Sequence, residues 1–288
     1  MKFGVFTVCL PEYTPAEAVK VLKQMGYDGV EWRVQTVPEK FPENVPFEQR
    51  YWGANRCTLD VEKLEEQAAL AKGWAEEAGI EVFSLSTYLP SGETKKLEEV
   101  ARVAAANGIP CVRSFPYKYP NPDGRSIREL IAKTKEENKE LERIGKQYGV
   151  KFLIEIHMDT IVASPSAAYD QAQGIDPAYF GYIYDPGNMV NEGYEDYEKG
   201  LTLLGDYVAH VHMKNGLLVP DAPGEFGEAR FKRAWVPLKK GMADLPRFAK
   251  LLKQVGYDGT VSVEDFSNEE GTVEKLTGDL AYLKQLFA

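Results

Sequence analysis

The side chains best suited to chemistry share one place in the sequence pattern, because they come at the ends of short β-prone runs. Carboxylates or imidazoles end four such runs in succession, and the chain has only three histidines. The residues are Glu155 and His157 in LIEIH, Asp185 in YIYDPGN, His210, His212 and Lys214 in HVHMKN, and Glu264 in SVEDF. Because side chains alternate along a strand with period two, those in each run that are two residues apart face the same side.

Carboxylates gathered at one rim repel each other unless a cation neutralises them. Three carboxylates with one imidazole suit Mn²⁺, Mg²⁺ or Co²⁺ better than a closed structural zinc site. Each residue alone has an ordinary interpretation: an acid such as Asp265 usually caps a helix, and His210 fits core packing as well as substrate contact. The coincidence of four strand ends predicts a site for one divalent metal ion.

The elements that position these residues are indicated by a repeated phrase, KVLKQMGYDG at 20–29 and KLLKQVGYDG at 250–259. Thr14 and Glu17 form a capping-box pattern before the first copy, and Asp244 is the expected cap before the second. Each copy predicts a helix, a stop at Gly26 or Gly256, and a strand. We expect the two units to lie side by side.

The same helix, glycine and strand order recurs between the two copies, and with the opening run KFGVFTV it predicts eight strands. Strands that alternate with helices indicate a parallel sheet. Eight such units in this length predict an α/β fold, a closed (β/α)8 TIM barrel forming a single domain over residues 1–288. A chance repeat in an open sheet is the alternative. In a barrel, the chemistry lies at the carboxyl ends of the strands.

Composition limits the partners. The formal net charge of −10 over 288 residues disfavours nucleic acid and anionic membranes. No run approaches the roughly 20 apolar residues of a membrane helix. Three cysteines without CxxC spacing indicate a reducing compartment, so we expect a cytoplasmic protein.

Two long connections are expected near the catalytic rim. Residues 37–58 read as a lid-like loop over the site, in which Trp52 and Arg56 offer an aromatic face and a polar end, beside Tyr51 and Asn55. The alternative is a surface excursion that packs on its own aromatics. Residues 214–238, with Arg230 and Trp235, read as a second long loop that either closes the site or packs against a second copy in a homo-oligomer.

The ordered set LIEIH, YDPGN, HMKN and SVEDF, with GYDGVEWR after the first helix, resembles the xylose isomerase-like barrel superfamily of sugar isomerases and epimerases. The resemblance implies the metal ligands Glu155, Asp185, His212 and Glu264. It implies substrate contacts from Glu31, His157 and Lys214. We also expect Arg33, Asn188 and His210 to contact the substrate. Asn188 and the run MKNG at 213–216 depart from the pattern of the ketose 3-epimerases of this superfamily. Those enzymes have histidine at the position of Asn188, and Glu and Arg after the histidine that matches His212.

The implied activity is metal-dependent isomerisation or epimerisation of a small-molecule sugar or polyol. Glu155 and Glu264 are the expected acid/base residues that remove and return a proton beside a carbonyl, with metal charge stabilising the enediolate. A dehydratase acting on an inositol- or sugar-derived ketone begins with the same proton removal and remains an alternative. A barrel that binds a polyol without turnover is the other alternative.

Overall fold

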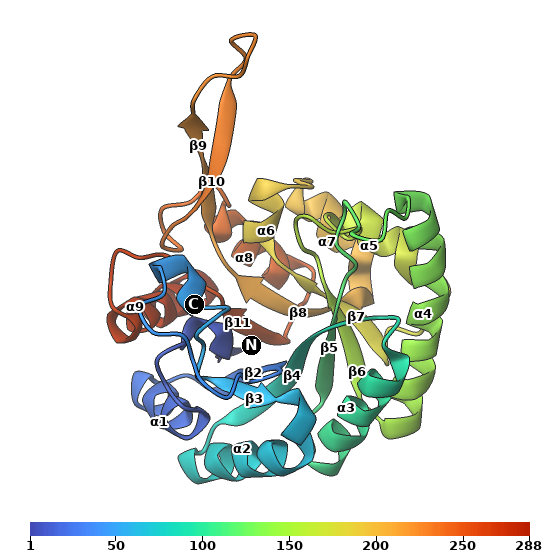
Figure 1. Cartoon of the computed structure of the whole chain (residues 1–288), viewed down its shortest axis with the longest axis vertical. Helices are drawn as coiled ribbons and strands as arrows, with labels where there is room; N and C mark the ends of the chain where they lie inside the picture. The colour runs from blue at the N-terminus through green and yellow to red at the C-terminus, as the bar shows by residue number, and fades with distance from the viewer.

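The computed structural model describes residues 1–288 (Figure 1). The strands are β1 (Lys2–Phe6), β2 (Gly29–Gln35), β3 (Thr58–Asp60), β4 (Glu81–Pro90), β5 (Cys111–Phe115), β6 (Lys151–Glu155), β7 (Phe180–Tyr184), β8 (Val208–Met213), β9 (Gly216–Asp221), β10 (Arg230–Trp235) and β11 (Thr260–Val263). The helices are α1 (Pro15–Met25), α2 (Leu64–Ala78), α3 (Thr94–Ala106), α4 (Ile127–Tyr148), α5 (Pro165–Ala172), α6 (Pro186–Asn191), α7 (Tyr197–Leu204), α8 (Leu245–Gln254) and α9 (Thr272–Phe287).

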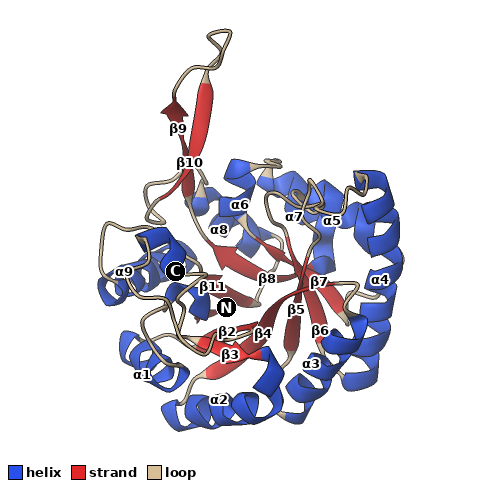
Figure 2. Cartoon of the chain, in the orientation of Figure 1, coloured by secondary structure: helices blue, strands red, loops and turns tan.

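Eight parallel strands close into a barrel, and helices surround it (Figure 2). Around the barrel the strand order is β1, β2, β4, β5, β6, β7, β8 and β11. Closure runs through β1, which pairs with β2 from Gly4 to Phe6 and with β11 from Lys2 to Val5. The short strand β3 pairs only with β2. The predicted (β/α)8 barrel is confirmed.

Local sequence signals set the helix boundaries. The Thr14 hydroxyl accepts a hydrogen bond from the Glu17 amide, and the Glu17 carboxylate accepts one from the Thr14 amide, which together form a capping box. Gly26 ends α1 with φ 91°, in the left-handed region that favours glycine. Asp244 caps α8 by accepting from the Arg247 amide, and Gly256 takes φ 76° just beyond that helix.

The repeated phrase occupies α1–β2 and α8–β11. The two units flank the closing point of the barrel but are not adjacent, because β1 lies between β2 and β11 and α9 packs against both α1 and α8. The expectation that they lie side by side is therefore wrong by one strand and one helix. Both units still perform the same task, since each delivers a strand to an edge of β1.

The interior of the barrel changes character along its axis. Near the amino ends of the strands, the Phe83 ring fills the space that a Cβ at Gly4 or Gly29 would need. Toward the carboxyl ends the buried interior is polar, with serines, histidines, carboxylates and a buried arginine. Apolar residues between strands and helices form the main core. The polar end of the barrel is thus where chemistry can occur.

The two long connections differ from each other in structure. Residues 36–57 are irregular and contain a single 3-10 turn, Phe47–Arg50. That this segment acts as a lid stays a prediction. Residues 214–238 are not a loop. They contain the antiparallel hairpin β9–β10, which projects away from the barrel (Figure 1). The acidic and glycine-rich stretch APGEFGEA, residues 222–229, forms its tip between the two strands.

Two observations bear on the compositional predictions. No helix is long and apolar enough to cross a membrane. Cys9, Cys57 and Cys111 form no disulfide, and burial raises the pKa of each thiol, so none is an activated nucleophile.

Candidate functional site

Four buried side chains from consecutive strands converge at the carboxyl end of the barrel. Glu155 ends β6, Asp185 follows β7, His212 lies near the end of β8, and Glu264 follows β11. One ligand atom from each lies within 4.8 Å of the others. The structure therefore brings together the set proposed from the sequence as metal ligands.

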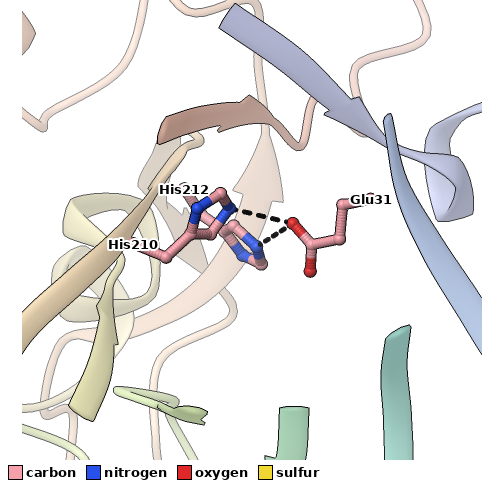
Figure 3. Close-up of side chains that lie close together, drawn as sticks. All are labelled: Glu31, His210 and His212. Atoms are coloured by element: carbon pink, nitrogen blue, oxygen red, sulfur yellow. Dashed lines mark hydrogen bonds and ion pairs between the residues drawn. The ribbon is translucent and has the colours of Figure 1, made fainter. Parts of the chain in front are cut away.

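His212 is oriented by a carboxylate on the far side of its ring. Its Nε2 lies 3.0 Å from Glu31 Oε2, and His210 Nε2 lies 3.0 Å from the same oxygen (Figure 3). A carboxylate that accepts from Nε2–H leaves Nδ1 as the ligand nitrogen. His212 Nδ1 faces Glu155 Oε1 at 3.4 Å, Glu264 Oε2 at 3.7 Å and Asp185 Oδ2 at 3.9 Å.

The two carboxylate oxygens of Asp185 have different roles. Its Oδ1 caps α6 by accepting from the Asn188 amide at 2.9 Å, while Oδ2 turns toward the cluster. The turn is possible because residue 187 is glycine, since a Cβ there would collide with the backbone of Lys214. The sequence DPGN thus provides a cap, a sharp turn and a ligand oxygen together.

Glu155 is held by two partners. Arg113 Nη1 donates to its Oε2 at 2.6 Å, with both side chains 1% exposed, and Asn188 Nδ2 donates to its Oε1 at 3.0 Å. Burial by itself raises the pKa of Glu155, but Arg113 and then His212 outweigh burial and hold that pKa well below its ordinary range. Glu155 is therefore ionised at neutral pH.

Lys214 places an ammonium among the carboxylates. Its Nζ lies 2.8 Å from Asp185 Oδ2, contacts Glu264 Oε2 and donates to Asn188 Oδ1 at 2.9 Å. Burial raises the pKa of Glu264 to about 7, although Lys214 acts in the opposite direction and Glu155 in the same one. The two glutamates therefore differ in proton affinity, as an acid/base pair requires.

The cluster passes a test for a cation site. His212 Nδ1 makes no hydrogen bond, and Asp185 Oδ2 and Glu264 Oε2, which face the same centre, are paired only with the Lys214 ammonium. Buried polar atoms are normally paired, so an unpaired ring nitrogen beside three carboxylates and a single ammonium indicates room for a further cation. The oxygen-rich donor set with one imidazole fits a divalent cation, which would compete with the Lys214 ammonium for two of these oxygens.

A cavity of about 480 Å³ opens above the cluster. Its lining comprises Gln35, Trp52, Tyr88, Arg113, Phe115, Lys118, Glu155, His157, Met158, Lys214, Trp235, Glu264 and Phe266. His157 Nδ1 donates to the Met158 carbonyl at 2.6 Å, so its other nitrogen remains for a ligand. Burial lowers the pKa of His157, which favours the neutral ring.

Several residues predicted to contact substrate lie elsewhere. Glu31 and His210 are fully buried below the cluster, where His210 also contacts Thr260 and Ser262. Arg33 donates to Thr58 and to the Trp52 carbonyl, beneath the lid-like segment.

Asn188 is buried between Glu155 and Lys214 and does not line the cavity, and Arg56 is exposed and donates to the Glu12 carbonyl. Tyr51 and Asn55 are buried under the segment, with Asn55 bound to the Val8 and Tyr51 carbonyls, so Trp52 alone of the lid candidates reaches the cavity.

Sequence reasoning missed much of the lining. Arg113 and Phe115 are two apart in CVRSF, a strand whose arginine signals an inward charge that needs a carboxylate partner. Tyr88 lies near the end of the long strand β4, and Phe266 comes two residues after Glu264. These aromatics resemble ordinary core residues in the sequence, and no local signal separates them from the core.

Comparisons with known proteins agree with the barrel fold. A sequence model described as xylose isomerase-like TIM barrel matches residues 19–286. Among solved structures, the chain is similar to 3-keto-D-glucoside 4-epimerase from E. coli, with TM-score 0.72, 17% identity and 99% of each chain covered.

It is also similar to the probable 3-DHS dehydratase of petrobactin synthesis from Bacillus anthracis, with TM-score 0.69, 15% identity and 99% of each chain covered. A third similar structure is the IOLI protein with a bound zinc atom, with TM-score 0.68, 17% identity, and coverage of 100% of this chain and 98% of that one. No curated protein matches the sequence.

Proposed function

The chain belongs to the xylose isomerase-like TIM barrel family, and we propose that it is a divalent-metal-dependent isomerase or epimerase of a sugar or related polyol ketone. The observation that carries the proposal is the convergence of Glu155, Asp185, His212 and Glu264, two of which, Glu155 and Glu264, line the cavity. These four residues would hold one cation, with Mn²⁺, Mg²⁺ or Co²⁺ favoured by the donor set. When bound, it would supply Lewis-acid stabilisation of negative charge on substrate oxygens.

Glu155 and Glu264 are the acid/base residues of the proposed reaction. The ionised Glu155 takes the proton from the carbon beside the carbonyl, and the C–H electron pair moves into the ketone to give an enediolate. Glu264, whose pKa burial raises to about 7, can gain or lose a proton near neutral pH and returns one to carbon. Exchange with solvent then restores both carboxyl groups.

Neighbouring residues orient and bind the reactants. Arg113 holds Glu155 ionised and fixes its direction through the 2.6 Å ion pair. His157, with Nδ1–H on the Met158 carbonyl, presents Nε2 as an acceptor for a substrate hydroxyl. Lys214 lines the cavity as well as the cluster, so its ammonium can donate to a substrate oxygen.

A dehydratase is the second candidate, supported by the similarity to a probable 3-DHS dehydratase and by the identical first step. Product analysis separates the two. The Mn²⁺-loaded protein, incubated with sugar and polyol ketones, should form isomers or epimers without an ultraviolet chromophore, and a chelator should abolish the reaction. Release of water with an absorbing enone would assign the lyase, and no product from any ketone would contradict both.

A further inference from the structure

Aromatic side chains form two walls of the cavity. The first, here called the Tyr88 wall, consists of Tyr88 and Phe115, whose ring centroids are 5.7 Å apart. The second, the Trp235 wall, consists of Trp235, Phe266 and Trp52, with Phe266 5.8 Å from Trp235 and 4.8 Å from Trp52.

The two walls come from opposite sides of the barrel. Tyr88 lies on β4, and Trp235 is at the base of the hairpin that follows β8, the strand four places around the barrel from β4. Phe115 ends β5, and Phe266 follows β11, again four places away in a ring of eight. The cavity is therefore lined by aromatic side chains from opposite sides of the barrel.

Polar groups are concentrated between these walls. Glu155, His157, Lys214 and Glu264 line the cavity at or beside the candidate metal cluster. Aromatic ring faces carry partial negative charge and attract C–H groups. A hydroxyl turned against such a wall finds no hydrogen-bond acceptor of ordinary strength and loses its water. The cavity thus suits a ligand with C–H faces and polar edges.

We infer that the substrate is a ketone whose ring stays closed during the reaction, such as a keto-pyranoside or a polyhydroxycyclohexanone. This inference rests on the function proposed above. A closed ring directs C–H groups to its faces and equatorial hydroxyls to its edge, which matches two walls and a polar floor. An open-chain ketose carries hydroxyls in all directions and loses more conformational freedom on binding.

The cavity size is compatible with a ring that bears substituents. A volume of about 480 Å³ falls within the range of about 300–1,000 Å³ for sites that enclose small-molecule ligands. Trp52 is 45% exposed and contacts Phe266, so the Trp235 wall includes one side chain from the lid-like segment.

Inositol and sorbitol provide a matched test, because they carry the same number of hydroxyl groups and differ in ring closure. Calorimetric titration of the Mn²⁺-loaded protein should show inositol binding about tenfold more tightly, the worth of good aromatic contact on both faces. Phe115→Leu and Trp235→Leu should each remove most of that preference. Phe226→Leu, at the hairpin tip where the side chain is 90% exposed, is the control and should keep it.

Thermal unfolding shows whether each variant folds. If Phe115→Leu does not fold, Tyr88→Leu tests the same wall, and if Trp235→Leu does not fold, Trp52→Leu does so. Equal binding, tighter sorbitol binding, no binding of either polyol, or a ring preference that survives loss of both walls would overturn the inference.

Turnover distinguishes this inference from the proposed function. Deuterium should enter the α-carbon of pentahydroxycyclohexanone or a methyl keto-glucopyranoside faster than that of fructose or tagatose, whose carbonyl is free only in the open chain. Exchange confined to fructose and tagatose would overturn the ring-closed substrate and leave the proposed function standing. No exchange in any ketone would contradict the proposed function, while the titration would still decide the ring preference.

Discussion

Replacing Glu31 by glutamine should weaken metal binding although Glu31 lines no part of the cavity. Its Oε2 lies 3.0 Å from the Nε2 atoms of both His210 and His212, and its Oε1 accepts from the Ser86 hydroxyl at 2.5 Å. Burial raises the pKa of Glu31, but the imidazoles of His212 and His210 hold that pKa well below its ordinary range. An ionised acceptor therefore fixes the direction in which His212 Nδ1 points.

The size of the effect follows from the loss of this acceptor. Glutamine keeps the shape but removes the charge, and one of its two terminal atoms becomes a donor. Loss of the partner that orients a metal-bound histidine costs about 10- to 100-fold in metal affinity. That corresponds to roughly 1.4–2.8 kcal/mol of binding free energy.

The assay is competition between the protein and a chromogenic chelator for Mn²⁺ or Co²⁺, after the purified protein has been stripped of metal. The visible spectrum of the Co²⁺ form reports the ligand geometry independently of activity. Ser86→Ala, which removes only the hydroxyl on Oε1, is the matched control and should weaken binding less. An unchanged affinity and Co²⁺ spectrum in a folded Glu31→Gln protein would refute the positioning role.

Three further predictions concern the cavity, the buried lysine and pH. Trp52→Ala should raise KM about tenfold and leave the thermal unfolding midpoint nearly unchanged, because the side chain is 45% exposed and lines the cavity. A lowered unfolding midpoint with unchanged kinetics would show a packing role instead. Lys214→Met should tighten Mn²⁺ binding at least about tenfold and slow turnover, because the Lys214 ammonium competes with the metal ion for Asp185 Oδ2 and Glu264 Oε2. Weaker Mn²⁺ binding in that variant would contradict this competition. Burial lowers the pKa of His212, but Glu31 and Glu155 outweigh it and raise that pKa well above its ordinary value, so metal binding must release a proton. Metal affinity should therefore rise about tenfold per pH unit until the pH passes that pKa, and a flat profile between pH 6 and pH 8 in chelator competition would contradict a protonated His212.

The barrel and its cluster were predictable because both depend on short-range rules. Helix caps, glycine stops and strand runs recur along the whole chain, and their alternation specifies a parallel barrel. Residues at the ends of parallel strands must meet at one rim, so four strand ends sufficed to bring Glu155, Asp185, His212 and Glu264 together.

Depth inside the barrel was not predictable in the same way. A period of two says which side of a strand a residue faces but not how far along the barrel axis it lies. Glu31, Arg33 and Gln35 alternate along β2, yet only Gln35, the last of them, lines the cavity. His210 lies one such step below His212 and joins Glu31 in the buried layer.

The structure of the long connections was also not predictable from the sequence. Residues 214–238 contain two runs that pair as a hairpin, but the proline and glycine between them resemble a loop as much as a turn. The aromatic walls assemble from β4, β5, β11 and the two connections, and such long-range convergence leaves no periodic signal in the sequence.

Deuterium exchange tests the central claim most directly. In D₂O, the metal-loaded protein should introduce deuterium at the carbon beside the carbonyl of a suitable ketone, and the chelated protein should not. Glu155→Gln and Glu264→Gln, each restored to full Mn²⁺ occupancy, should each cut turnover by about 10²- to 10⁴-fold, the usual worth of general acid–base catalysis. A variant that exchanges deuterium without forming product would identify the remaining glutamate as the first base. Full activity in both variants at full metal occupancy would contradict proton transfer by this pair.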